Sequence, residues 1–292
     1  MPRRISALAS SILTATLFIS SASAVQITAS ERADLAPTGK LRIGINTGNI
    51  LLTGKDLATG TPRGIVFDLA RELEGQVGLP VEIVTFDSAG ELAEGIKTGA
   101  WDVAFLGIEP ERAEGIAFSP PYAEIVATYL VPAGSSIKTI ADVDKEGVRI
   151  AISAKSAYDL VLTRSLKHAK LHRVPGAPGV PGVEGAYNLF ASEKLEVLAA
   201  LKPVLIEYTD KLPGSRVLDG SISTVYQAIG TPKDRDAGAK FLQRFVEEIK
   251  ANGLVAKTIT KNGARGLSVA PAQTLGFLMK EQGILHSLSL FN

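Results

Sequence analysis

The chain has 292 residues, a formal net charge of +1 and 46% hydrophobic residues. Its length allows about two domains of ~150 residues each, and the absence of cysteine excludes disulfides, thiolate metal sites and cysteine nucleophiles. The nearly neutral charge argues against a nucleic-acid-binding protein, which usually has a basic face.

The first residues have the pattern of an export signal. Arg3 and Arg4 precede the uncharged stretch 5–19, and Ala22-Ser23-Ala24 supplies an A-x-A cleavage site. This order is typical of a secretory signal peptide over 1–24. The alternative is an uncleaved anchor, but the stretch is shorter than the ~20 residues that span a membrane. We therefore expect a periplasmic protein, without a lipid anchor because no cysteine is present.

The mature chain is expected to begin with a loose polar leader over 25–39, followed by alternating strand and helix patterns. Branched apolar residues predict the first strands, over 41–45, 81–84 and 103–106. Apolar residues at helical spacing predict the intervening helices, over 65–73 and 89–98. Strands and helices that alternate with short loops predict right-handed βαβ units and a mainly parallel sheet.

The alternation then restarts in a second block. Strand patterns occupy 127–131, 148–152, 171–174, 196–201 and 224–230. Helix patterns occupy 156–168 and 237–252. The glycine- and proline-rich segment 176–185 is predicted to be a surface loop.

These patterns predict an α/β protein of two lobes with a ligand site between them. We expect lobe 1 over 40–128, lobe 2 over 129–223, and a return strand with lobe 1 helices over 224–292. The last helices have no sheet of their own, so they are expected to pack on lobe 1. The chain then crosses between the lobes twice, and an interlobe cleft is a preferred place for a small ligand.

Four segments in order resemble one protein family. They are Gly64-Ile-Val-Phe-Asp-Leu-Ala70, Gly95-Ile-Lys-Thr-Gly-Ala-Trp-Asp-Val103, Pro110-Glu-Arg-Ala-Glu114 with Phe118-Ser-Pro-Pro-Tyr122, and 137–152. They are similar to segments of the bacterial extracellular solute-binding proteins of family 3, the receptors for polar amino acids. The resemblance covers about 40–253.

The resemblance implies a type II periplasmic-binding-protein fold and the function of a non-enzymatic receptor. Such receptors deliver a solute to the membrane permease of an ABC importer, and we expect a monomer without cofactor or metal. Two alternatives remain open. One is a periplasmic enzyme like the cyclohexadienyl dehydratases, with Glu109 or Glu184 as its acid. The other is an accessory protein of a sensor or a dehydrogenase.

Arg112 occupies the position that clamps the ligand's carboxylate in this family. A guanidinium suits the task because its planar fork donates two parallel charge-assisted hydrogen bonds. The alternative is a surface arginine neutralised by its acidic neighbours, Glu109, Glu111 and Glu114.

Five further residues are candidate ligand contacts. Ser153, Ser156 and Tyr158 surround the expected start of a helix in lobe 2, where free backbone N–H groups can hold an anion. Asn46 and Asn49 follow the first strand at its carboxyl end, where open α/β sheets bind ligands. A capping serine, a half-buried tyrosine and turn-forming asparagines are the alternatives.

Two departures from the family pattern concern the amino group of the ligand. The loop between Asp102 and Arg112 is shorter, and Leu201-Lys202-Pro203 stands where the family's ammonium-binding aspartate should fall. A buried ammonium without a counter-charge is costly. We therefore expect plain amino acids to bind poorly. Lys202 is a candidate contact for a second anionic group, or it points to solvent.

Overall fold

The computed structural model describes residues 27–56 and 58–272. Within this part of the chain, no helix is long and apolar enough to cross a membrane. The predicted signal peptide over 1–24 lies outside the described residues, as does the end of the expected last segment, 273–292.

Lobe 1 is built on three parallel strands. Strand β1 (Leu41–Asn46) pairs on one side with β4 (Val81–Phe86) and on the other with β5 (Val103–Gly107). Helices α2 (Ile65–Val77) and α3 (Ala89–Glu94) connect them, and the 3-10 turn η1 (Gly95–Thr98) continues α3. The sequence prediction of strands and helices in this block is confirmed.

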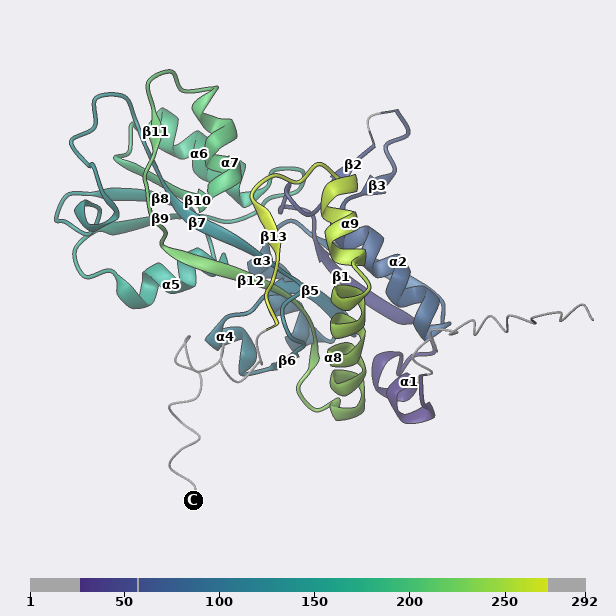
Figure 1. Cartoon of the computed structure of the whole chain (residues 1–292). Coiled ribbons are helices and arrows are strands. Elements are labelled where there is room, and N and C mark those ends of the chain that lie inside the picture. The colour runs from purple at the N-terminus through teal and green to yellow at the C-terminus, as the bar shows by residue number, and fades with distance from the viewer. Residues whose placement is uncertain (1–26, 57, 273–292) are drawn as a thin grey trace, which may run out of the picture.

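Lobe 2 repeats the arrangement. Strand β8 (Arg149–Ser153) lies between β9 (Lys170–Val174) and β10 (Val197–Leu201), again in parallel. Its helices are α5 (Ala157–Ser165), α6 (Gly182–Ser192) and α7 (Lys202–Thr209). Figure 1 shows these elements as a separate body from lobe 1.

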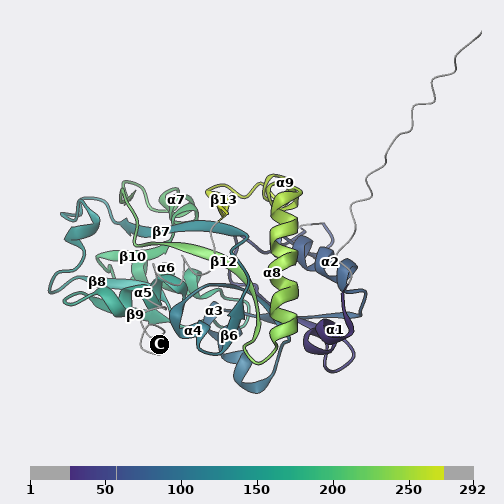
Figure 2. The ribbon, with the colours of Figure 1, turned by 60° about the horizontal axis from the view of Figure 1, so that its bottom comes forward.

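Two long antiparallel strands join the lobes. Strand β7 (Ala123–Val131) pairs with β10 of lobe 2, and β12 (Ser223–Pro232) pairs with β5 of lobe 1. The two strands also pair with each other, from Ser223↔Ala127 to Gln227↔Ala123. One mixed sheet therefore runs through both lobes, in the order β4-β1-β5-β12-β7-β10-β8-β9 (Figures 1 and 2).

Short elements complete the structure. Strands β6 (Ile116–Phe118), β11 (Arg216–Val217) and β13 (Leu267–Val269) pair with the crossing strands. A small hairpin consists of β2 (Gly54–Lys55) and β3 (Pro62–Arg63). The remaining short helices are α4 (Pro110–Ala113) and the 3-10 turn η2 (Ile140–Asp142).

The late helices pack on lobe 1, as the sequence predicts. Helix α8 (Asp236–Ala251) contributes one apolar face, including Phe241, Phe245 and Ile249, to the core beneath β1 and α2. Helix α9 (Leu254–Lys261) follows it after Gly253, whose left-handed backbone lets the chain turn.

The structure corrects two expectations. The leader is not loose over its whole length, because helix α1 (Ala29–Leu35) forms there with a Thr28–Glu31 capping box and a fully buried Leu35. The segment 176–185 is not a loop throughout, because α6 begins at Gly182, where buried Ala186 and Phe190 give the helix an apolar face. Both helices are stabilised by packing against the rest of the protein, and the local amino-acid composition does not indicate this packing.

Candidate ligand-binding site between the lobes

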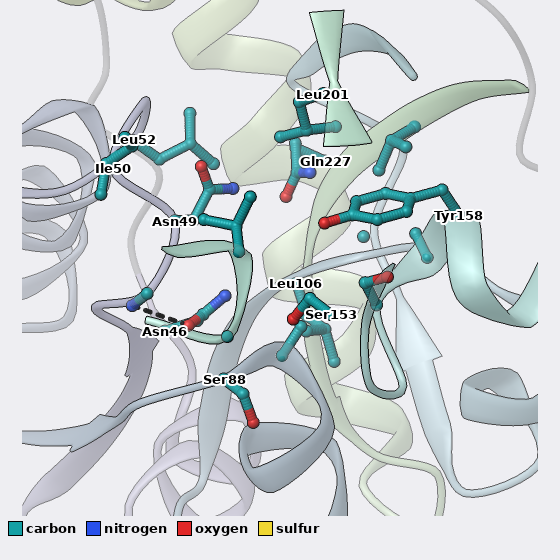
Figure 3. Close-up of a pocket in the computed structure, with 18 of the residues that line it drawn as sticks. Asn46, Asn49, Ile50, Leu52, Ser88, Leu106, Ser153, Tyr158, Leu201 and Gln227 are labelled. Atoms are coloured by element: carbon teal, nitrogen blue, oxygen red, sulfur yellow. Dashed lines mark hydrogen bonds between the residues drawn. The ribbon is translucent and has the colours of Figure 1, made fainter. Parts of the chain in front are cut away.

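A cavity lies between the lobes, at the carboxyl ends of the parallel strands (Figure 3). It encloses about 800 Å³ of space, including its open mouth. Aliphatic side chains such as Ile50, Leu106 and Val225 form much of its wall, and a smaller set of polar groups comes from both lobes. A cavity lined by both apolar side chains and convergent polar groups is a typical form of a small-molecule site.

Arg112 lines this cavity and joins the two lobes. Its side chain is buried, and its Nη1 donates a hydrogen bond of 2.8 Å to the carbonyl oxygen of Gly107 at the end of β5. Its Nη2 donates a hydrogen bond of 2.9 Å to the carbonyl oxygen of Lys155, which lies in lobe 2 between β8 and α5. The Nε atom is buried and has no partner among the described residues. Arg112 thus retains, beside the cavity, one buried donor without a partner in the described part of the chain.

The charge of Arg112 is buried without a hydrogen-bonded carboxylate among the described residues. Burial lowers the pKa of Arg112 to about 10, against the opposing effect of the nearby Glu109 and Glu111 charges. Those two carboxylates accept hydrogen bonds from Arg164 instead. Arg112 remains a cation at neutral pH, and a buried cation of this kind favours an anionic ligand group.

The two predicted asparagines approach the cavity from lobe 1. The Asn46 Oδ1 atom accepts a hydrogen bond of 2.9 Å from the Gly48 backbone N–H, so this side chain also shapes its own loop (Figure 3). The Asn49 Oδ1 atom is buried and has no partner among the described residues. Two residues that line the cavity, Asn49 and Arg112, thus each keep one buried polar atom, an acceptor and a donor, without a partner among the described residues.

The three predicted residues of lobe 2 also line the cavity. Ser156 caps α5, where its hydroxyl accepts a hydrogen bond of 3.2 Å from the Asp159 N–H. Tyr158 comes from the first turn of α5, and its hydroxyl end points into the cavity (Figure 3). Burial raises the pKa of Tyr158, so the phenol stays protonated and can donate as well as accept. Ser153 ends β8 with its side chain at the wall.

Lys202 is not among the residues that line the cavity. It is the first residue of α7, and the preceding Leu201 and the later Val204 form this part of the wall. The structure thus brings six of the seven predicted residues together and leaves Lys202 outside, and a ligand contact by Lys202 stays a prediction.

Four of the lining residues that the sequence reasoning missed contribute polar groups or close packing to the cavity. Asp87 and Ser88 follow β4, and the rule that ligands bind at the carboxyl ends of strands could have found them. Gly182 lies so close to the Ser153 hydroxyl that a β-carbon would come within 2.4 Å of it. Gln227 comes from the crossing strand β12, and nothing in its local sequence distinguishes it.

The acids proposed for an enzyme lie elsewhere. Glu109 is buried at the N-terminal end of α4 and Glu184 is exposed on α6, and neither lines the cavity. Among the described residues, Asp87 is the one acidic residue in the lining, and it is half-buried. The charged part of the wall therefore consists of Arg112 and Asp87.

Comparison with known families identifies one match. The family model of the bacterial extracellular solute-binding proteins, family 3, matches residues 41–264. No curated protein sequence matches the chain.

Solved structures with the same fold include amino-acid receptors. A Streptococcus pneumoniae substrate-binding protein of an amino-acid ABC transporter, bound to L-arginine, is 20% identical with a TM-score of 0.65, over 82% of this chain and 99% of its own. The L-cysteine solute receptor of Neisseria gonorrhoeae is 20% identical with a TM-score of 0.66, over 79% and 92%. An ancestral amino-acid-binding protein described as a precursor of cyclohexadienyl dehydratase is 22% identical with a TM-score of 0.65, over 79% and 98%.

Proposed function

The chain belongs to family 3 of the bacterial extracellular solute-binding proteins, and from this premise we propose that it is the periplasmic receptor of an ABC importer for a small carboxylate-bearing solute. The signal-peptide pattern over 1–24 supports export to the periplasm. The partner would be the importer's membrane permease, and the receptor would bind its solute without converting it. Glu109 and Glu184, the two acids considered for an enzyme, are not among the lining residues.

The observation that supports this function most directly is the incomplete hydrogen bonding of Arg112. A buried guanidinium normally satisfies its donors, yet Nε has no partner among the described residues. A ligand carboxylate in the cavity would accept from this atom and neutralise the buried charge. Because Nη2 of Arg112 already reaches Lys155 in the other lobe, the same side chain would link solute capture to lobe closure.

The finer proposal concerns the rest of the solute. At the junction of β10 and α7 the wall is the aliphatic Leu201, so an ammonium would find no counter-charge there. The unpartnered Asn49 Oδ1 favours a neutral hydroxyl or amide donor instead. The solute is therefore a carboxylate with an apolar body and a neutral donor, in preference to a plain zwitterionic amino acid.

Native mass spectrometry of the purified protein, followed by a thermal-shift screen of carboxylates with and without an α-amino group, tests both statements. A solute at 100 times its Kd should stabilise the protein by about 2.7 kcal/mol. Failure of every carboxylate to stabilise it would contradict the receptor function. An amino acid that binds only with its amine intact would contradict the finer proposal, and Asp87→Asn would then reveal whether Asp87 pairs with that amine.

A further inference from the structure

An ion-pair network outside the cavity connects the lobes. Helix α4 of lobe 1 and helix α5 of lobe 2 lie side by side in both views (Figures 1 and 2). Arg164 on α5 donates from Nη1 to Glu111 Oε1 and Oε2, at 2.5 Å and 2.7 Å, and from Nη2 to Glu109 Oε2 at 3.0 Å. One guanidinium thus holds two carboxylates of the facing lobe.

A second contact between the lobes lies near the first. Lys155, in the loop before α5, places Nζ 3.1 Å from Glu94 Oε1 on α3 of lobe 1. Gly90 on α3 permits this approach, because a β-carbon there would lie 2.7 Å from Cβ of Lys155. The segment of lobe 2 between Lys155 and Arg164 therefore forms ion pairs with lobe 1 at both of its ends.

The network differs from an ordinary surface ion pair in the burial of one partner. The side chain of Glu109 is 3% exposed, whereas those of Glu111 and Arg164 are 43% and 38% exposed. An exposed pair is screened by water and contributes little. Separation of the lobes would break charge-assisted hydrogen bonds to a carboxylate that is buried in this arrangement, and such bonds contribute more than those between two solvated charges. None of the three residues lines the cavity.

We infer that Arg164 is an interlobe latch: its hydrogen bonds to Glu109 and Glu111 populate the closed arrangement before any solute binds. This goes beyond the proposed function, because the latch acts without solute and does not depend on the solute's identity. A receptor whose closed state is already populated gains apparent affinity, since less of the binding free energy is spent on closure. Arg164 is a positioning residue in this scheme and touches no ligand.

The test measures the interlobe distance in solute-free protein. The chain has no cysteine, so Glu74→Cys on α2 and Ala191→Cys on α6 would be the only two thiols for spin labels. Both positions are exposed and lie in different lobes. Carried solute is removed by unfolding in guanidinium and refolding. Double electron–electron resonance then gives the populations of short and long distances, closed and open.

We expect mainly short distances in the labelled parent protein and a closed-to-open ratio that falls about five-fold or more in Arg164→Gln. Arg164→Lys, which keeps the charge but not the fork, should retain part of the closed population. Glu111→Gln should also open the protein, and adding it to Arg164→Gln should have little further effect, because the two residues act as one pair.

The matched control is Arg149→Gln. Arg149 pairs with Glu196 at 2.9 Å inside lobe 2, and its side chain is 38% exposed, like that of Arg164. This variant should keep the parent distance distribution. Long distances alone in the solute-free parent, or an unchanged distribution in both Arg164→Gln and Glu111→Gln, would overturn the latch while leaving the receptor function intact. If Arg164→Gln does not refold, Glu111→Gln decides the question.

Discussion

Two buried charges in lobe 1 have opposite relations to their surroundings. Asp102, fully buried before β5, accepts from Arg42 Nε at 2.9 Å, Arg42 Nη2 at 2.8 Å and Arg235 Nη1 at 2.9 Å. Arg112, buried after β5, donates to two backbone carbonyls and leaves Nε without a partner among the described residues. A buried charge with complete hydrogen bonding thus precedes β5, and one with incomplete hydrogen bonding follows it.

The difference separates a structural charge from one available to a ligand. Asp102 ties β1, β5 and the start of α8 together, so every oxygen is used within the protein. Arg112 faces the cavity, where a complete internal set of partners would leave nothing for a solute. Substitutions at the two ends of β5 should therefore affect different measurements.

The largest effect is expected for Asp102→Asn. Removal of this carboxylate charge leaves Arg42 and Arg235 without their common counter-charge, and loss of one partner of a buried pair costs about 3–5 kcal/mol. Urea denaturation should show the loss, while solute affinity of the folded protein stays unchanged. A folded variant with parental stability would show that Arg42 and Arg235 find equivalent partners elsewhere.

Arg112→Ala should have the reverse pattern. The affinity for the solute identified by mass spectrometry should fall by roughly 2–5 kcal/mol, by analogy with truncated buried charge pairs, and Arg112→Lys should restore part of it. Unfolding free energy without solute should change less than the affinity, because the loss of two hydrogen bonds to backbone carbonyls is offset by the removal of a buried charge. Calorimetry measures the affinity of the variant and denaturation measures its stability. A variant that unfolds much more easily but binds the solute like the parent protein would show that Arg112 has a structural role.

A fall in pH should remove the charge of Asp102 gradually, and so reproduce part of the effect of Asp102→Asn. Burial alone would raise the pKa of Asp102, but the hydrogen bonds from Arg42 and Arg235 outweigh it and hold the pKa below its ordinary value. The stability from ionised Asp102 is complete above the unfolded-state pKa of about 3.9 and is lost as the pH falls through the lower folded-state pKa. Its slope cannot exceed about 1.4 kcal/mol per pH unit. Urea denaturation at a series of pH values below about 5, roughly one unit above that pKa, measures this pH dependence of the unfolding free energy. The dependence should be weaker in Asp102→Asn. Identical pH dependence in the two proteins would contradict the role of Asp102.

Asn49→Ala tests the unsatisfied acceptor and should have the smallest effect. Solute affinity should fall by about 1 kcal/mol, the net contribution of one hydrogen bond. Solute-free stability should stay the same or rise slightly, because the substitution removes a buried oxygen that has no partner among the described residues. Calorimetry with the same solute measures the first quantity and thermal melting the second. Unchanged affinity would mean that Asn49 contributes only to the structure of the loop after β1 and does not contact the solute.

The sequence was informative wherever local pattern and tertiary role coincide. The predicted strands and helices follow apolar periodicity. Asn46 and Asn49 were found because they follow a strand, and Ser153 because it stands near the expected start of a helix. Arg112 was found through a motif. These residues lie at positions that the topology itself brings to one edge of the sheet.

Features that depend on long-range packing were beyond the sequence. Gln227 reaches the cavity because β12 crosses between the lobes beside β5. Lys202 is the half-buried first residue of α7 and lies outside the cavity wall. Helix α1 depends on its contact with α8, where Glu31 pairs with Arg244. The Arg164 network requires two helices that are far apart in the chain to meet.

The pairing along β7 bears on where the protein can bend. Residues Ala123–Ile125 are flanked by β12 on one side and β13 on the other, and Ala127 already pairs with both β12 and β10. Between them, Val126 has a single cross-strand partner among the described residues, Thr224. Because no third strand in the described part of the chain flanks the crossing at Val126, the lobes would turn relative to one another about Val126 and Thr224, while the strands on either side keep their pairing.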